Sequence, residues 1–172
     1  MKRTDNLILI GFMATGKTAV GKVLAKKLKA KYVSTDTLVE KRAKQKIKAI
    51  FKEKGEDHFR RLETLVLKSL KGKKNMVISC GGGIVIKPAN RALLRKLGVV
   101  IWLKASPEII NSRLGSLKQR PLLNIREKSK RMKKIREMLK FRDSLYKKSS
   151  HISIDTSSLG LSQAVRKIAS VI

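Results

Sequence analysis

Residues 11–18 read Gly-Phe-Met-Ala-Thr-Gly-Lys-Thr and follow a short apolar run at residues 7–10. This is the phosphate-loop pattern G-x-x-x-x-G-K-[ST], placed between an expected strand and a helix expected over residues 17–28. Backbone N–H groups of such a loop point inward and hold phosphate oxygens, helped by the positive end of the helix dipole. The pattern predicts binding of a nucleoside triphosphate, with Lys17 reaching the β- and γ-phosphates and Thr18 ligating Mg²⁺. A chance Gly-rich turn before a helix is the alternative.

The motif leaves the reaction open, because motors, GTPases and small-molecule kinases all use it, and composition narrows the choice. The chain has 172 residues, which is typical of a single domain over residues 1–172. It has no apolar run of about 18 residues that could span a membrane. The first expected strand begins too near the N-terminus to leave room for a secretory signal, and the one cysteine, Cys80, excludes an internal disulfide framework. We therefore expect a cytoplasmic protein.

The charge balance is extreme, with 42 Lys and Arg residues against 12 Asp and Glu residues and a net charge of +30. Such an excess is typical of nucleic-acid-binding proteins, but here it is spread along the chain. There is no RNA-binding motif, basic tail or set of aromatic residues for base stacking. We interpret the lysines mainly as a solvated surface and expect no specific nucleic-acid partner. A positive surface would also steer anionic substrates toward a cleft.

Strands and helices alternate, which predicts an α/β fold with a mainly parallel sheet and right-handed crossovers. The residues between 37 and 70 form a long, mostly helical excursion, which we interpret as a substrate-binding insertion. Residues 115–126 have few periodic apolar positions and are interpreted as a lid, in which Arg120 could close over phosphates. The expected strands are 7–10, 31–34, 76–80, 99–103 and 152–155, and the other expected helices are 56–70, 90–97, 107–114, 127–148 and 161–172.

Two charged positions, one just before the insertion and one within it, are candidates for substrate contacts. Asp36 follows the second expected strand, where a carboxylate beside the phosphate loop could accept a proton from an attacking hydroxyl. The alternative for Asp36 is an N-cap of a helix that begins at residue 37. Arg60 has Glu56 four residues before it and Glu63 three residues after it, so both carboxylates could hold its guanidinium. A routine surface ion pair is the alternative for that group.

Three glycines, Gly81, Gly82 and Gly83, directly follow the third expected strand. Consecutive glycines lose extra entropy on folding, so they favour a place where the backbone closely approaches a ligand and donates N–H groups to it. A plain tight turn is the alternative. The neighbouring Cys80 is interpreted as a small core residue rather than a nucleophile.

Arg142 occupies an apolar face of the last long helix. Met132, Ile135, Leu139 and Tyr146 share that face at helical spacing. A buried arginine needs an anionic partner, and this chain is poor in acidic residues, so a ligand carboxylate or phosphate is the favoured partner. An internal pair with a distant Asp or Glu is the alternative.

Together these motifs make the chain resemble the shikimate kinase family over nearly its whole length. The resemblance implies a three-layer αβα P-loop kinase fold with a five-stranded parallel sheet of order 2-3-1-4-5, an insertion at about residues 35–62 and a lid at about residues 113–126. It also implies transfer of the ATP γ-phosphate to the 3-hydroxyl of shikimate by a monomer, in chorismate and aromatic amino acid biosynthesis. The matching elements are the loop at 11–18, Asp36, Ile50-Phe51, Gly55-Glu56, Phe59-Arg60-Arg61-x-Glu63, the glycines at 81–83, Arg120-Pro121-Leu122 and Arg142-x-x-x-Tyr146.

The resemblance also implies a role for each matching position. Asp36 would be the catalytic base or would orient the hydroxyl, while Lys17 and Arg120 would stabilise the transferring phosphoryl group. Mg²⁺ is the implied cofactor, with Thr18 as its ligand. The positions implied to bind shikimate are Asp36, Arg60, Gly82 and Arg142, with Phe51 and Phe59 as walls of the pocket. The positions implied to bind ATP are Gly11, Ala14, Thr15, Gly16, Lys17, Thr18, Ala19, Arg113 and Arg120, with the loop after Asp155 beside the adenine.

Two positions depart from the family pattern. Ser34 stands where the family usually has an aspartate that holds Mg²⁺ through water, so we expect weaker Mg²⁺ binding. Ala14 stands where the loop often has glycine, which is tolerable if its φ is negative. A gluconate-type kinase, a nucleic-acid-binding nucleotide hydrolase and a catalytically lapsed relative are the alternatives that the sequence leaves open.

Overall fold

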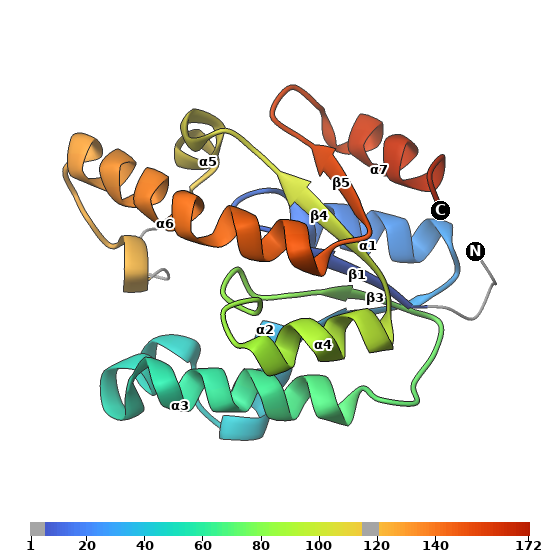
Figure 1. Ribbon diagram of the computed structural model, residues 1–172, viewed down its shortest axis with the longest axis horizontal. Coiled ribbons are helices and arrows are strands. Elements are labelled where there is room, and N and C mark those ends of the chain that lie inside the picture. Colours follow the sequence, from blue (N-terminus) through green and yellow to red (C-terminus); the bar gives the residue numbers. More distant parts are fainter. Residues whose placement is uncertain (1–5, 115–120) are drawn as a thin grey trace.

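The structure is a computed structural model that describes residues 6–114 and 121–172 (Figure 1). Its strands form one sheet in the order β2-β3-β1-β4-β5, and each neighbouring pair is parallel. The expected sheet order is therefore confirmed. The elements in chain order are β1 (Asn6–Ile10), α1 (Lys17–Lys27), β2 (Lys31–Ser34), α2 (Thr35–Ala43), α3 (Ile47–Ser69), β3 (Met76–Ser79), α4 (Pro88–Leu97), β4 (Gly98–Lys104), α5 (Pro107–Arg113), a short 3₁₀ turn (Pro121–Leu123), α6 (Lys128–Ser149), β5 (Ile152–Asp155) and α7 (Leu161–Ala169).

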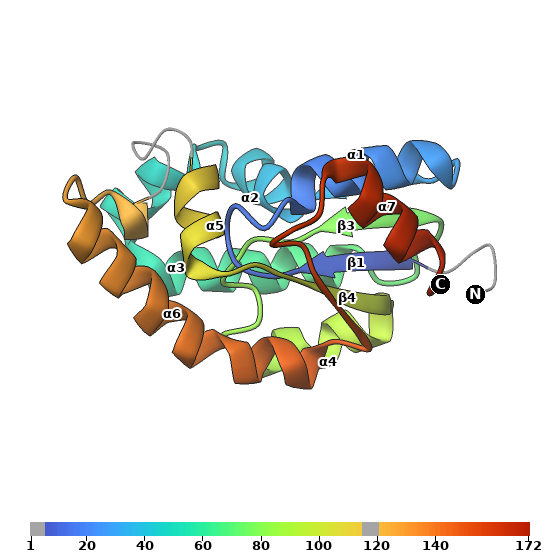
Figure 2. The same ribbon diagram turned by 90° about the horizontal axis from the view of Figure 1, so that it is seen from above.

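The central strand β1 shows why the sequence makes a three-layer fold. All five of its residues are buried, because side chains alternate between two covered faces. Ile8 and Ile10 belong to the core beneath α4 and the C-terminal ends of α3 and α6. Leu7 and Leu9 belong to the opposite core, beneath α1 and α7. Figure 2 shows these helices on the two sides of the sheet, and each buried Leu or Ile contributes about 1.5–3 kcal/mol.

The insertion is built from α2 and α3, and its boundaries differ from those expected. α2 begins at Thr35, two residues earlier than predicted, and Ser34 is its N-cap because its hydroxyl accepts a hydrogen bond from the Thr37 N–H at 3.3 Å. α3 starts at Ile47 and is interrupted at Gly55, whose φ of 75° and ψ of 175° are not helical. The helix predicted over residues 56–70 is therefore the second part of a longer, broken helix. Glycine suits the break because it adopts positive φ without a Cβ penalty.

The remaining elements match the sequence to within a few residues at their ends. The last helix, α7, stops at Ala169 rather than at residue 172, since helix ends fray where packing ends. No helix within residues 6–114 and 121–172 combines the length and apolar character that crossing a membrane requires.

Candidate active site

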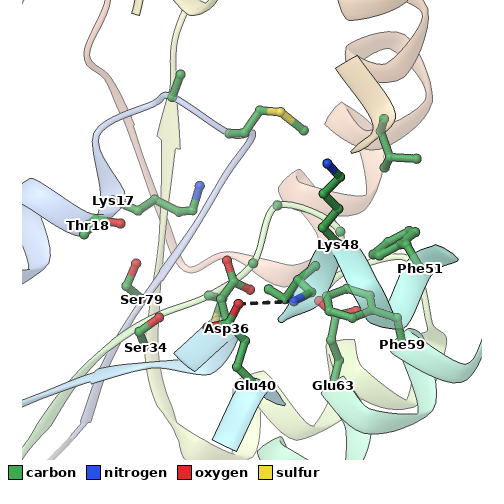
Figure 3. A pocket seen from close by; sticks show the side chains of 18 of the residues that line it. Lys17, Thr18, Ser34, Asp36, Glu40, Lys48, Phe51, Phe59, Glu63 and Ser79 are labelled. Carbon is green, nitrogen blue, oxygen red and sulfur yellow. Dashed lines mark hydrogen bonds between the residues drawn. The ribbon is translucent and has the colours of Figure 1, made fainter. Parts of the chain in front are cut away.

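The carboxyl ends of β1, β2 and β3 lie at one edge of the sheet, because these strands are parallel. A cavity of about 950 Å³ opens there, between the phosphate loop, the insertion and α6 (Figure 3). Gly11 and Thr15 are buried in the loop and do not line it. The predicted site residues that do line it are Ala14, Gly16, Lys17, Thr18, Ala19, Ser34, Asp36, Phe51, Phe59, Arg60, Gly82, Arg113 and Arg142.

The phosphate loop is held in shape by contacts around the Phe12 carbonyl oxygen. It accepts hydrogen bonds from the Thr15 hydroxyl at 2.8 Å and from the Lys17 ammonium at 2.7 Å. Gly11 has a φ of 141°, and a Cβ there would overlap the Leu103 carbonyl oxygen, so only glycine fits. Lys17 is mostly buried at the first turn of α1, where it points into the cavity.

Ala14 adopts a φ of 62°, which is the left-handed region. Alanine was expected to be tolerable only if this φ were negative, and that condition is not met. The phosphate loop imposes the left-handed conformation here, and an L-residue in that region costs roughly 1–2 kcal/mol relative to glycine. The loop pattern consequently contains a strained residue.

Hydroxyl side chains gather beside Lys17, at the start of α1 and at the ends of β2 and β3. Thr18, Ser34 and Ser79 all line the cavity and lie together in Figure 3. Ser79 was not singled out from the sequence, because a serine at a strand end is common. Among the described residues, no group of three or more His, Cys, Asp or Glu side chains could hold a metal by itself.

Asp36 lies in the first turn of α2 and points into the middle of the cavity. Ser34, rather than Asp36, caps the helix, so the alternative interpretation of Asp36 as the N-cap is wrong. The carboxylate instead packs against the glycine triplet: a Cβ at Gly81 would lie 2.5 Å from Asp36 Oδ1. The Asp36 carboxylate can therefore lie beside Lys17 and the phosphate loop only because residue 81 is a glycine.

Arg60 is held by both neighbouring glutamates, as its helical spacing predicted. Its guanidinium lies 2.7 Å from Glu56 Oε1 and 2.7 Å from Glu63 Oε2. Arg60 is 4% exposed and Glu63 is fully buried, so the interpretation of a routine surface pair is wrong. Burial lowers the pKa of Arg60, but Glu63 and Glu56 more than offset this and the pKa is raised overall.

Glu63 carries a second, unused oxygen. Burial raises the pKa of the Glu63 carboxyl to about 7, against the opposing effect of Arg60. Its Oε1 atom is buried and accepts no hydrogen bond from the described residues. This carboxyl therefore takes up a proton much more readily than an exposed glutamate.

The glycine triplet gives room to three different parts of the site. Side chains at Gly81 and Gly83 would overlap Asp36 and the Arg60 guanidinium, and a Cβ at Gly82 would lie 3.2 Å from the Met13 backbone nitrogen. The plain tight turn offered as an alternative does not explain these close approaches. The triplet lets charged side chains approach the backbone, and the expected N–H donation to a ligand stays a prediction. Cys80 is buried in the core as expected, and burial raises its pKa.

Arg142 enters the cavity from α6 and is 5% exposed. It makes no ion pair within residues 6–114 and 121–172, so the alternative of an internal pair finds no support there. Its guanidinium contacts the Gly82 carbonyl oxygen at 3.4 Å, and its Nε atom has no hydrogen-bond partner among the described residues. Its Cζ lies 5.6 Å from the centre of the Phe12 ring. The Tyr146 hydroxyl donates a hydrogen bond to the same Gly82 oxygen.

Two further sides of the cavity match the expected layout. Phe51 and Phe59 pack with ring centroids 4.8 Å apart and form an aromatic wall. Arg113 donates a hydrogen bond to the Thr156 carbonyl oxygen at 2.9 Å, which joins α5 to the loop after β5. Arg120, which was expected in the lid, lies outside the described residues.

The sequence did not single out Glu40, Lys46 and Lys48, which also line the cavity. Glu40 accepts a hydrogen bond from the Ile47 N–H at 3.1 Å and pairs with Lys46 at 3.2 Å, so it ties α2 to the start of α3. No local signal distinguishes Lys46 and Lys48 in a chain with 42 basic side chains.

A phosphate loop that faces a carboxylate and two buried arginines across one cavity defines a P-loop phosphotransferase for a small anionic acceptor. The family model for shikimate kinase matches residues 13–172. The chain belongs to the shikimate kinase family. The alternatives of a gluconate-type kinase and a nucleic-acid-binding hydrolase are therefore not favoured.

Relatives and solved structures agree with this assignment. The chain is 44% identical to a shikimate kinase of Pelotomaculum thermopropionicum over 95% of its own length and 92% of the relative's. It is 42% identical to one of Dehalococcoides mccartyi, over 91% and 86% of the two chains. A structure of shikimate kinase from Acinetobacter baumannii in complex with shikimate superposes with a TM-score of 0.91 at 34% identity, covering 97% of this chain and 92% of that one. The shikimate kinase structure from Aquifex aeolicus gives 0.80 at 32% identity, with 95% and 94% covered.

Proposed function

We propose that this protein transfers the γ-phosphate of ATP to the 3-hydroxyl of shikimate and releases shikimate 3-phosphate and ADP. Membership of the family and likeness to a structure with bound shikimate support this substrate. The observation that carries most weight is Arg142, a buried cation without an ion pair in the described part of the chain, facing the same cavity as Lys17. A ligand carboxylate would supply its missing anionic partner.

On the acceptor side, Arg60 and Arg142 would grip the shikimate carboxylate, with Gly82 contributing its backbone and Phe51 and Phe59 enclosing the ring. Two arginines suit a planar carboxylate because each guanidinium can donate in bidentate fashion. Glu56 and Glu63 already fix the Arg60 guanidinium, so little of its side-chain entropy is lost on binding.

The chemical step joins the acceptor hydroxyl oxygen to the γ-phosphorus and breaks the bond to the bridging β–γ oxygen, which leaves with ADP. Asp36 would orient the hydroxyl and receive its proton, since it lies in the middle of the cavity between the two substrate sides. Lys17, with Arg120 from the proposed lid, would neutralise the charge on the transferring group.

The nucleotide side follows from the phosphate loop. Backbone N–H groups from Gly11 to Ala19, including Ala14, Thr15 and Gly16, would hold the phosphates, and Arg113 with the loop after β5 would flank the adenine. We also propose that residues 1–172 act as one monomeric unit, in which residues 35–62 bind the acceptor and residues 113–126 close over ATP.

The side chains near the loop fit Mg²⁺ bound together with ATP. They are hydroxyls rather than a cluster of carboxylates, and Mg²⁺ in such sites takes few protein ligands and keeps water and phosphate oxygens. Thr18 would be the direct ligand, and Ser34 would contact a water of the metal. When bound, the ion offsets negative charge on the β- and γ-phosphates.

The decisive experiment measures ADP release with MgATP, with and without shikimate, at moderate salt. We expect strong dependence on shikimate, and a loss of about 10²–10⁴-fold in turnover in Asp36→Asn. Arg142→Ala should raise the KM for shikimate, while Lys140→Ala, an exposed change on the same helix, should change nothing. Turnover stimulated by gluconate or RNA and indifferent to shikimate would refute the proposal.

A further inference from the structure

Lys48 lines the cavity but has no role in the proposed phosphoryl transfer. It lies in the first turn of α3 and lines the same cavity as Lys17 and Asp36. Figure 3 shows the Lys48 side chain extending into the cavity from the side of Phe51, opposite Lys17, with Asp36 between the two lysines. The nucleotide side and the acceptor side thus each present an ammonium group.

The backbone that carries Lys48 is fixed relative to Asp36. The Ile47 N–H donates to Glu40 Oε1 at 3.1 Å, and Glu40 belongs to α2, whose first turn contains Asp36. Ile50, two residues after Lys48, is fully buried against Val39 of α2. Lys48 therefore keeps its place in the wall of the cavity even though its long side chain is exposed.

The Lys48 ammonium has no competing partner in the described part of the chain. The nearby carboxylate of Glu40 is already used by Lys46 at 3.2 Å and by the Ile47 N–H. Glu63, a second acidic residue of the cavity, pairs with Arg60 at 2.7 Å. An ammonium group in this position is free to bind an anion that arrives on the acceptor side.

We propose that Lys48 binds the phosphoryl group after it has passed to the acceptor, so that it contacts the phosphate ester of the product. This inference rests on the proposed function. The acceptor carboxylate already has two arginines, whereas the ester phosphate lies near the acceptor hydroxyl beside Asp36. Lysine is a compact point charge on a long stem, which suits a phosphate that is present in the product and absent from the acceptor.

Binding measurements separate this role from a general effect of charge. Calorimetric titration with shikimate and with shikimate 3-phosphate should show that Lys48→Gln weakens binding of the phosphate ester roughly tenfold and leaves shikimate nearly unaffected. Lys52→Gln is the matched control, because Lys52 is exposed on the next turn of α3 and does not line the cavity. Both variants remove one positive charge, and glutamine is a good helix former.

Each outcome decides the matter. Equal weakening of ester binding in both variants would mean that only the overall field acts, and would overturn the role of Lys48. Equal weakening of both ligands in Lys48→Gln would place the contact at the carboxylate end and would overturn it too. An unchanged ratio of the two affinities refutes Lys48 alone, whereas a wild-type protein that binds neither ligand refutes the proposed function with it.

Discussion

At the scale of single residues, Ala14 is an alanine in a backbone conformation that favours glycine. The φ of 62° is imposed by the phosphate loop, so alanine bears a cost of roughly 1–2 kcal/mol there. Glycine would remove this cost but add about 0.4–1 kcal/mol of unfolded-state entropy. We expect Ala14→Gly to raise the free energy of unfolding by about 0.5–1 kcal/mol in urea denaturation. Ala19→Gly, in the first turn of α1, should lower it by about 1 kcal/mol, and equal losses in both variants would contradict the strain.

Ser34 carries a testable consequence for the metal. Ser34→Asp would place a carboxylate beside Thr18, so we expect the Mg²⁺ concentration for half-maximal turnover to fall several-fold. Because aspartate is as good an N-cap as serine, α2 should keep its stability. Ser34→Ala is the control: it removes the cap, costs about 1 kcal/mol and does not tighten Mg²⁺. An unchanged Mg²⁺ dependence in Ser34→Asp would refute the prediction that Ser34 weakens Mg²⁺ binding.

Glu63 predicts a pH dependence of stability. Its pKa is raised to about 7 by burial, from a usual value of 4.5, so between these values the folded protein keeps a proton that the unfolded chain has released. The free energy of unfolding should therefore fall as pH rises from 4.5 to 7, by up to about 1.4 kcal/mol per unit. We expect Glu63→Gln to abolish this slope in urea titrations across that range. The exposed change Glu137→Gln should preserve it, and a slope that survives in Glu63→Gln would exclude Glu63 as its source.

At the scale of elements, the features that could be predicted are those that follow from the spacing of apolar residues along the sequence. The strands, their parallel direction and the buried face of α6 with Ile135, Arg142 and Tyr146 agree with the sequence pattern. The order of the strands in the sheet was implied by the family resemblance, and it is confirmed as well. On that face Met138 is also buried, and Met132 and Leu139 are half-buried and pack against the same core cluster as Ile135, as their spacing predicted.

Features that do not follow from the spacing of apolar residues could not be predicted. The break in α3 depends on one glycine, Gly55, in a segment with helical composition. The N-cap of α2 depends on whether Ser34 or Asp36 accepts a hydrogen bond from the first turn of the helix. The clearance between the glycine triplet and Arg60 depends on three-dimensional packing. The partners of Arg60 were predictable because they lie within one helix, whereas Lys48 reaches the cavity only through the placement of α3.

The contact between α6 and the glycine loop makes Tyr146 a positioning residue. Its hydroxyl satisfies the Gly82 carbonyl, so Arg142 contacts that oxygen only at 3.4 Å. In Tyr146→Phe the carbonyl would draw the guanidinium toward itself, so we expect the KM for shikimate to rise about tenfold with kcat and the KM for ATP little changed. Tyr32→Phe is the control, because the buried Tyr32 hydroxyl has no partner among the described residues. A fall in kcat with an unchanged KM for shikimate would argue against this role.

At the scale of the whole molecule, the net charge of +30 and the charge of the residues that line the cavity are both positive. Both substrates are anions, so a positive field favours their approach at low salt. The cavity concentrates this field, since its lining has more cations than acids. The cations are Lys17, Lys46, Lys48, Arg60, Arg113 and Arg142, and the acids are Asp36, Glu40 and Glu63.

The same charge destabilises the folded state through repulsion among solvated lysines, and salt screens that repulsion over a Debye length of about 10 Å at 0.1 M. We therefore expect the Tm to rise by several degrees between roughly 20 mM and 300 mM KCl. A variant with Lys52→Glu, Lys140→Glu and Lys148→Glu, all at exposed positions, should start from a higher Tm at low salt and gain less from KCl. If both proteins gained equally, salt would be acting through the solvent rather than through the charge of the chain, and repulsion would not be what limits the stability of this fold.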